Sequence, residues 1–442
     1  QVARIVLDPI LVEPFLLRAA ARLGTNDTAC LDDVRTVLEL APNTPQAFAL
    51  RARVLRASGH FDEAIEACRS AEAQAPREPE FGLLHAAILA DMGRFEHAIA
   101  KTRQSLGLCD RRAEMKAAAL AQLGDQLAAG PKHEYKAALE LHQQAVRQAD
   151  PLLKDRIAEV RTMARDALLA AYLGAASDIA WGPWQSKDTV VPKWLERAEQ
   201  LVASSETPEH LATSTITFCR GALEVCAAAS GAVDPKPWVD KLEPMGRRRL
   251  ETIRDPLASA TLEWELGQAM SAAMQAFQLR NDFAAAQQKG AMAVAYLEMA
   301  IPHRQANAAD TLSLARVYYR MGSMLAHDMK NDAEAVGWFD RAVPLIEDSL
   351  PSAAPGECAR QGEALVSMAV SYWELGRRER SLELTTTGVQ CLERAVERGA
   401  LTRDALAVPY ANLAAIHEFL GNDKSAKDYA AMAARMKGTQ VK

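Results

Sequence analysis

The sequence predicts an all-α protein, and composition carries the first part of that prediction. The 442 residues include 85 alanines, whereas aromatic residues make up only 6% of the chain and runs of β-branched residues are few. Alanine is the strongest helix former, while strands favour β-branched and aromatic residues. Apolar residues make up 49% of the chain, which is enough to build a core and argues against disorder.

An internal repeat indicates how the helices are arranged. The segment at 59–65 (GHFDEAI) recurs at 93–99 (GRFEHAI), 34 residues later. Two helices of about a dozen residues each, together with two tight turns, use up that length. The repeat therefore predicts consecutive helix–turn–helix units.

Each recurring position in this repeat has a physical role. Ala52 and Ala64 are small, so the two helices of one unit can approach closely. Gly59 ends the first helix, where glycine adopts the left-handed conformation most easily. Phe61 opens the second helix, and Pro76 ends it because proline has no donor for a further turn.

With small residues, glycine, an aromatic and proline in this order, the chain resembles the tetratricopeptide repeat (TPR) family. Residues 45–78 and 79–112 carry the clearest repeats, several later units are longer than 34 residues, and the middle of the chain is degenerate. The resemblance implies a right-handed α-solenoid, that is, a TPR-like superhelix of about ten stacked antiparallel helix pairs.

We expect three regions along the chain. Residues 1–150 form an N-terminal TPR array, 151–280 hold irregular helical repeats, and 281–442 form a C-terminal TPR-like array with longer repeats. The segment from Trp181 to Trp194 is either an exposed recognition loop or a plug at an irregular repeat junction. The plug is favoured, because large aromatic side chains usually bury their area.

Charge, hydropathy and cysteine usage exclude several classes of protein. A net charge of -6 argues against a nucleic-acid partner, and no stretch is long and apolar enough for a membrane span. Seven cysteines without a CxxC pair are expected to be buried, reduced thiols, which favours a cytoplasmic location. Export after loss of a signal peptide stays open, since the chain starts with Gln1 and is either processed or a piece of a longer protein.

No motif predicts catalysis, a metal site or a cofactor. Two His-Glu pairs begin an HExxH pattern, but Ala137 and Gly421 stand where the second histidine would have to be. Residues 124–132 (GDQLAAGPK) fail the spacing of a phosphate-binding loop. We therefore expect a protein that is not an enzyme.

The resemblance implies a concave groove lined by the first helix of each unit. Family positions that hold the C-terminal carboxylate of chaperones are Ala49, Arg53, Leu83 and Ala87 here, so that role is not expected. In the C-terminal repeats the groove is apolar with acidic flanks, which suits an amphipathic helix or an extended peptide with basic ends. The expected partner-binding residues are Arg53, Arg56, Glu80, Leu83, Trp373, Glu374, Glu418 and Phe419.

These observations predict a non-enzymatic scaffold that binds a peptide or helix of a partner protein in this groove. Two alternatives stay open. The chain could be the partner-binding or sensory C-terminal region of a larger enzyme such as a protein kinase, or a small-ligand binder or enzyme that uses the tryptophan-rich middle. Self-association also stays open.

Overall fold

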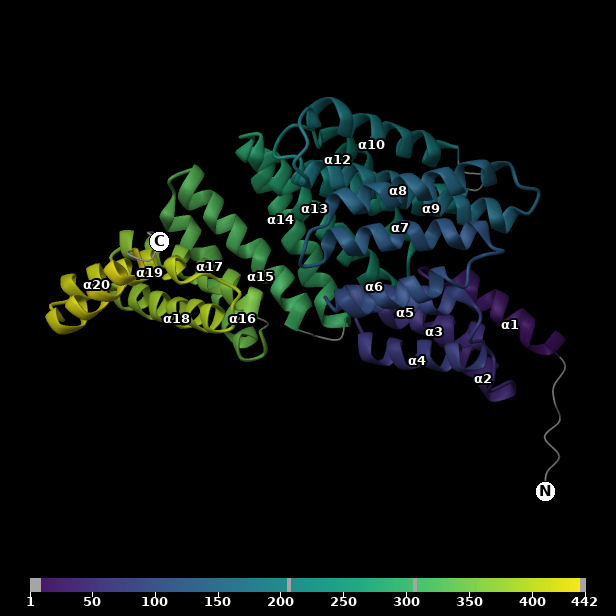
Figure 1. Cartoon of the computed structure of the whole chain (residues 1–442), viewed down its shortest axis with the longest axis horizontal. Helices are drawn as coiled ribbons and strands as arrows, with labels where there is room; N and C mark the ends of the chain where they lie inside the picture. Colours follow the sequence, from purple (N-terminus) through teal and green to yellow (C-terminus); the bar gives the residue numbers. More distant parts are fainter. Residues whose placement is uncertain (1–8, 205–207, 305–307, 354, 438–442) are drawn as a thin grey trace, which may run out of the picture. The chain divides into compact units, whose positions relative to one another are not determined.

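The computed structural model describes residues 9–204, 208–304, 308–353 and 355–437 (Figure 1). This part of the chain contains 20 α-helices, which form ten consecutive pairs, and no strand occurs among the residues described. The predicted all-α fold of stacked helix pairs is confirmed. Gln1 lies outside the described residues.

The chain forms two compact units, Gln1–Ala306 (unit 1) and Asn307–Lys442 (unit 2). The helices of unit 1 are α1 (Pro9–Arg22), α2 (Asp27–Leu40), α3 (Pro45–Ala57), α4 (Phe61–Gln74), α5 (Pro79–Asp91), α6 (Phe95–Leu106), α7 (Ala113–Ala129), α8 (Tyr135–Ala149), η1 (Asp150–Lys154), α9 (Ala158–Trp181), α10 (Lys187–Ala203), α11 (Pro208–Ala228), α12 (Lys236–Thr252), α13 (Pro256–Leu279), α14 (Phe283–Ala300) and η2 (Ile301–His303). Those of unit 2 are α15 (Ala308–Ser323), the π-helical turn η3 (Met324–Asp328), α16 (Asp332–Ser349), η4 (Leu350–Ser352), α17 (Pro355–Glu374), α18 (Arg378–Glu397), η5 (Arg403–Leu406), α19 (Ala407–Phe419) and α20 (Asp423–Lys437). The predicted division of the chain into the regions 1–150, 151–280 and 281–442 depends on how regular the repeats are, and it stays a prediction.

The turns inside the clearest repeats adopt the predicted geometry. Gly59 and Gly93 have φ angles of +79° and +72°, in the left-handed region that glycine enters without strain. The next helices begin at Phe61 and Phe95, as the repeat predicts. Because glycine ends one helix and the aromatic residue starts the next, the pair folds back on itself within a short turn.

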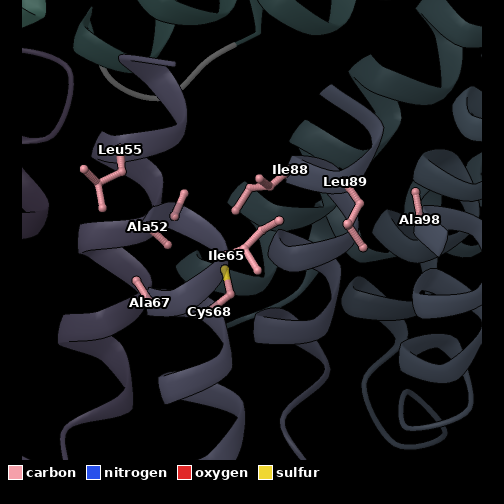
Figure 2. Close-up of a cluster of buried hydrophobic side chains, with 9 residues drawn as sticks. Ala52, Leu55, Ile65, Ala67, Cys68, Ile88, Leu89 and Ala98 are labelled. Atoms are coloured by element: carbon pink, nitrogen blue, oxygen red, sulfur yellow. The ribbon is translucent and has the colours of Figure 1, made fainter. Parts of the chain in front are cut away.

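Small side chains allow the helices of one pair to lie close together. Ala52 of α3 and Ala64 of α4 are fully buried, and so is Ala98 of α6 in the next pair. Figure 2 shows the cluster in which they pack with larger apolar side chains such as Ile65 and Ile88. Removing this apolar surface from water is the main stabilising term of the stack.

Longer repeats are built from longer helices. Both α9 and α13 have 24 residues, whereas α3 has 13. No helix in the described ranges is long and apolar enough to cross a membrane.

Candidate partner-binding groove

Two of the predicted residues meet on the surface of unit 2. Trp373 lies near the end of α17 and Phe419 is the last residue of α19, and their ring centroids are 5.0 Å apart at an interplanar angle of 74°. This edge-to-face geometry is favourable for aromatic pairs. Phe419 nevertheless stays 63% exposed, so the pair packs against itself and still presents apolar surface.

Arg378, which the sequence analysis missed, holds this aromatic pair in place. It is the first residue of α18, and its guanidinium lies 4.0 Å from the Trp373 ring centroid and 5.1 Å from that of Phe419. A cation over an aromatic face is attracted by the negative charge density of the ring. The position of Arg378 just after the Gly376 turn was the available signal, because that turn brings the start of α18 beside the end of α17.

A cavity of about 230 Å³ opens beside the aromatic pair, between α17 and α19 and over α18. The hydroxyls at its floor are already used, since Ser381 Oγ donates to the Ala369 carbonyl at 2.8 Å and Thr385 Oγ1 donates to the Ser381 carbonyl at 2.7 Å. Its lining residues are Val366, Ala369, Val370, Trp373, Ser381, Thr385, Asn412, Ala415 and Ile416.

One polar side chain that lines the cavity, Asn412, is available for hydrogen bonding. The amide of Asn412 makes no hydrogen bond to any residue that the structure describes, and it offers both a donor and an acceptor. Val370 at the rim is 51% exposed. The cavity is therefore mostly apolar with one polar group able to orient a bound chain.

Acidic side chains flank the groove as predicted. Glu374 follows Trp373 on α17, Glu418 precedes Phe419 on α19, and Glu363 lies further back on α17. All three are exposed, and within the described part of unit 2 none of them takes part in an ion pair. The groove therefore carries carboxylates without an ion-pair partner in the described part of unit 2, although the Arg378 guanidinium lies close by over the aromatic pair.

The predicted residues of unit 1 are arranged differently. Arg53 donates to Glu80 at 2.5 Å, and Arg56 donates to Asp91 at the same distance, so both guanidiniums already have a carboxylate of the same chain. Leu83 is only 6% exposed and belongs to the core. It packs there with Cys109, Met115 and Ala119.

The tryptophan segment does not form a single plug. Trp181 is 55% exposed, which corrects the expectation of burial for that residue. Trp184 packs closely on Gly182, where an added Cβ would come within 2.0 Å of the indole. Trp194 contacts Tyr172 at a centroid distance of 5.9 Å. The segment thus buries two of its tryptophans in part and presents the third to solvent.

A buried charged network in unit 1 was also missed. His142 of α8 is fully buried, and its Nδ1 lies 2.7 Å from Oδ2 of Asp178 on α9, which is itself 1% exposed. Its Nε2 lies 3.2 Å from Asp125 Oδ1 on α7. Glycines on both neighbouring helices make room for the imidazole, because an added Cβ at Gly124 or Gly174 would approach Nε2 to 2.5 Å or 2.3 Å.

Electrostatics keep this histidine charged. Burial alone would lower the pKa of His142, but the hydrogen bonds and charges of Asp125 and Asp178 raise it to about 10. Burial raises the pKa of Asp178, and the hydrogen bond to His142 opposes that rise. The network joins three helices. His142 and Asp178 lie in the core and form a structural ion pair, whereas the Asp125 side chain is 56% exposed.

The described residues contain no group of three or more His, Cys, Asp or Glu side chains placed to hold a metal ion. The predicted buried, unpaired state of all seven cysteines is confirmed. Burial raises the pKa of Cys219 and of Cys226 to about 12, which leaves both as unreactive thiols at neutral pH.

Comparisons with known proteins add the following. No protein-family model matches the chain, and no curated protein matches it either. Among solved structures, the human IFIT1 dimer with PPP-AAAA is 15% identical with a TM-score of 0.28, over 96% of this chain and 99% of that one. Naa15/Naa10 bound to HypK-THB is 13% identical with a TM-score of 0.27, over 96% and 63% of the chains. The APC/C hetero-tetramer Cut9-Hcn1 is 12% identical with a TM-score of 0.25, over 92% and 84%. Similarity at this level supports no argument about a ligand or partner.

Proposed function

We propose that the chain is a TPR-family scaffold without enzymatic activity, and that it binds an extended segment of a partner protein in the groove of unit 2. One observation carries this proposal: an exposed aromatic and aliphatic surface surrounds a cavity whose flanking carboxylates have no partner in the described part of unit 2. Contiguous apolar surface with a polar rim is typical of a protein-binding site.

The volume of the cavity suits one side chain of a partner protein better than an entire small-molecule ligand. Its volume of about 230 Å³ lies below the range of about 300–1,000 Å³ that is usual for small-molecule sites. An aliphatic side chain of the partner enters between Val370 and Ile416 and removes their apolar surface from water.

The free amide of Asn412 distinguishes an extended segment from a helical one. The N–H and C=O groups of an extended backbone are available to hydrogen-bond with this amide, whereas in a helix these groups are hydrogen-bonded to each other. Lysine or arginine beside the aliphatic residue would face Glu374 and Glu418. Because the helices of the groove are ordered before binding, the groove contributes little of the entropy cost.

This proposal is tested with two displayed peptide libraries that differ only in their flanks, one lysine-flanked and one glutamate-flanked. We expect the full-length chain to enrich lysine-flanked peptides with a central aliphatic residue. Val370→Ser should weaken the selected peptide, measured by fluorescence anisotropy, while Met329→Ser should not, because Met329 is a 41% exposed residue of unit 2 that does not line the cavity.

The charge component has its own control. Glu374→Gln combined with Glu418→Gln should reduce the preference for lysine flanks, whereas Glu397→Gln near the end of α18 should leave it unchanged. Equal enrichment from both libraries, or full binding by the Val370→Ser variant, would contradict the proposal.

A further inference from the structure

The beginning and the end of unit 1 touch each other, although they are more than 200 residues apart in sequence. Asp255 is the N-cap of α13, and its Oδ2 accepts from the Ala258 amide at 2.9 Å. The same oxygen accepts from the Asp27 amide at the start of α2, at 3.1 Å across 228 residues. One carboxylate therefore satisfies first-turn amides of two helices that would otherwise lack a partner.

A second contact joins the same two regions. Arg304, which follows η2, donates through Nη1 to the Ala57 carbonyl at the end of α3, at 2.5 Å. Its guanidinium also lies 4.4 Å from the ring centroid of Trp264 on α13. A cation is favourable at a helix C-terminus, and the indole face adds a cation–π attraction.

Far fewer residues meet between α13 and α2 than between neighbouring helices of the stack, such as α13 and α14. Among the described residues, Leu257 of α13 packs against the cluster of α1, α2 and α3. Consecutive helix pairs elsewhere in the unit interlock through rows of buried alanine and leucine, such as Ala117, Leu120 and Leu127 on α7. The contact between α2–α3 and α13–Arg304, which we call the seam, is therefore polar and thin by comparison.

The closed circuit of helices surrounds a set of charged side chains. This inner charged cluster consists of Arg56, Asp91, Asp125, Arg220, Glu224 and Glu265. Burial opposes the charge of Arg220, but the carboxylates of Glu224, Glu265 and Asp91 raise its pKa. Because α5, α11 and α13 contribute these carboxylates around one guanidinium, the side chains share one interior, and their partial exposure shows that water reaches them.

We infer that the seam is a latch that holds unit 1 closed, and that the circuit opens there before any other helix interface separates. Local opening begins where few apolar contacts hold two elements together, and the seam is such a place. Opening moves α1–α3 away from α13 and gives solvent freer access to the inner charged cluster.

The inference is tested by native-state hydrogen exchange on the full chain, with substitutions that have matched controls. Asp255→Ala removes a helix cap and the link to Asp27, whereas Asp282→Ala removes only the cap of α14, which accepts from the Ala285 amide. Arg304→Ala removes the second link, whereas Arg280→Ala removes a comparable hydrogen bond to the Gly231 carbonyl within the stack.

We expect amide exchange across α1–α3 to accelerate about tenfold or more in each seam variant, because a charge-assisted hydrogen bond is lost in each. Exchange in α7–α9 should stay unchanged, and both control variants should behave as the unsubstituted chain in α1–α3. Asp255→Asn keeps a neutral hydrogen-bond acceptor, so its exchange rate in α1–α3 should lie between those of the unsubstituted chain and Asp255→Ala. This graded response distinguishes loss of the link from general loss of folding. Acceleration that is equal in the control variants, or that spreads over α1–α14 together, would overturn the inference.

Discussion

The interior of unit 1 and the groove of unit 2 are built from the same kind of helix pair but treat charge in opposite ways. In unit 1 the two arginines expected in the groove are neutralised inside the chain, in the pairs Arg53–Glu80 and Arg56–Asp91. In unit 2 the carboxylates beside Trp373 and Phe419 have no ion pair in the described part, and the surface between them is apolar.

The difference lies in which residues occupy the groove-facing positions of the helices. A charge that is already paired gains little from a partner, since a new ion pair must replace an existing one. Exposed apolar surface and unpaired carboxylates gain from any partner that covers them. This comparison therefore assigns binding to the groove of unit 2 and structural integrity to the paired charges of unit 1.

The largest expected effect comes from breaking the charge pair in the core of unit 1. His142→Leu leaves Asp178 buried without a partner, and we expect this to lower the free energy of unfolding by about 3–5 kcal/mol. Chemical denaturation measures the loss. Combining His142→Leu with Asp178→Leu should recover a large part of it, because no uncompensated charge remains; an equal loss in the single and double variants would show that the pairing has no role.

The same pair predicts a dependence of stability on pH. The pKa of His142 is about 10 in the folded chain against about 6.5 when unfolded, so the folded state binds the proton more tightly. The resulting stabilisation is fully present below about pH 6.5 and is lost as the pH rises towards 10, by at most about 1.4 kcal/mol per pH unit. Thermal unfolding followed from neutral to alkaline pH should show this decline, and a flat profile would contradict the protonated assignment.

For the groove of unit 2 we expect a clear loss of binding without loss of fold. Trp373→Ala removes an aromatic residue at the centre of the surface and should weaken a selected lysine-flanked peptide by about 30-fold, the equivalent of about 2 kcal/mol. Calorimetric titration gives the affinity. The matched variant Trp181→Ala removes an exposed tryptophan from unit 1 and should leave the affinity unchanged, so a similar loss in both variants would remove the distinction between the two regions.

The smallest effect is expected at the exposed ion pairs of unit 1. Arg53→Gln should change the free energy of unfolding by less than about 1 kcal/mol, since solvent screens the pair with Glu80. It should also leave peptide affinity unchanged. A tenfold loss of affinity in this variant would show that the peptide binds to unit 1 instead of unit 2.

Local rules in the sequence predicted much of the fold. The left-handed turn at Gly59, the helix start at Phe61 and the burial of Ala52 all depend on residues within one repeat, so spacing alone revealed them. The repeat register placed Trp373 and Phe419 among the expected groove residues, but it did not predict that their rings contact each other.

Features that depend on distant residues were not predictable in this way. His142 and Asp178 are 36 residues apart, and the link from Asp27 to Asp255 spans 228. No periodicity specifies which polar residue of a long helix faces which neighbour. The glycines that make room for His142 gave a weak signal, since a helical glycine often marks a close approach of another group.

Hydrogen exchange of the full chain with and without a saturating lysine-flanked peptide tests the central claim most directly. We expect added protection at residues 366–373 of α17 and 411–416 of α19, with no change at α3 and α5. Protection confined to α3 and α5, with the groove of unit 2 unaffected, would contradict it.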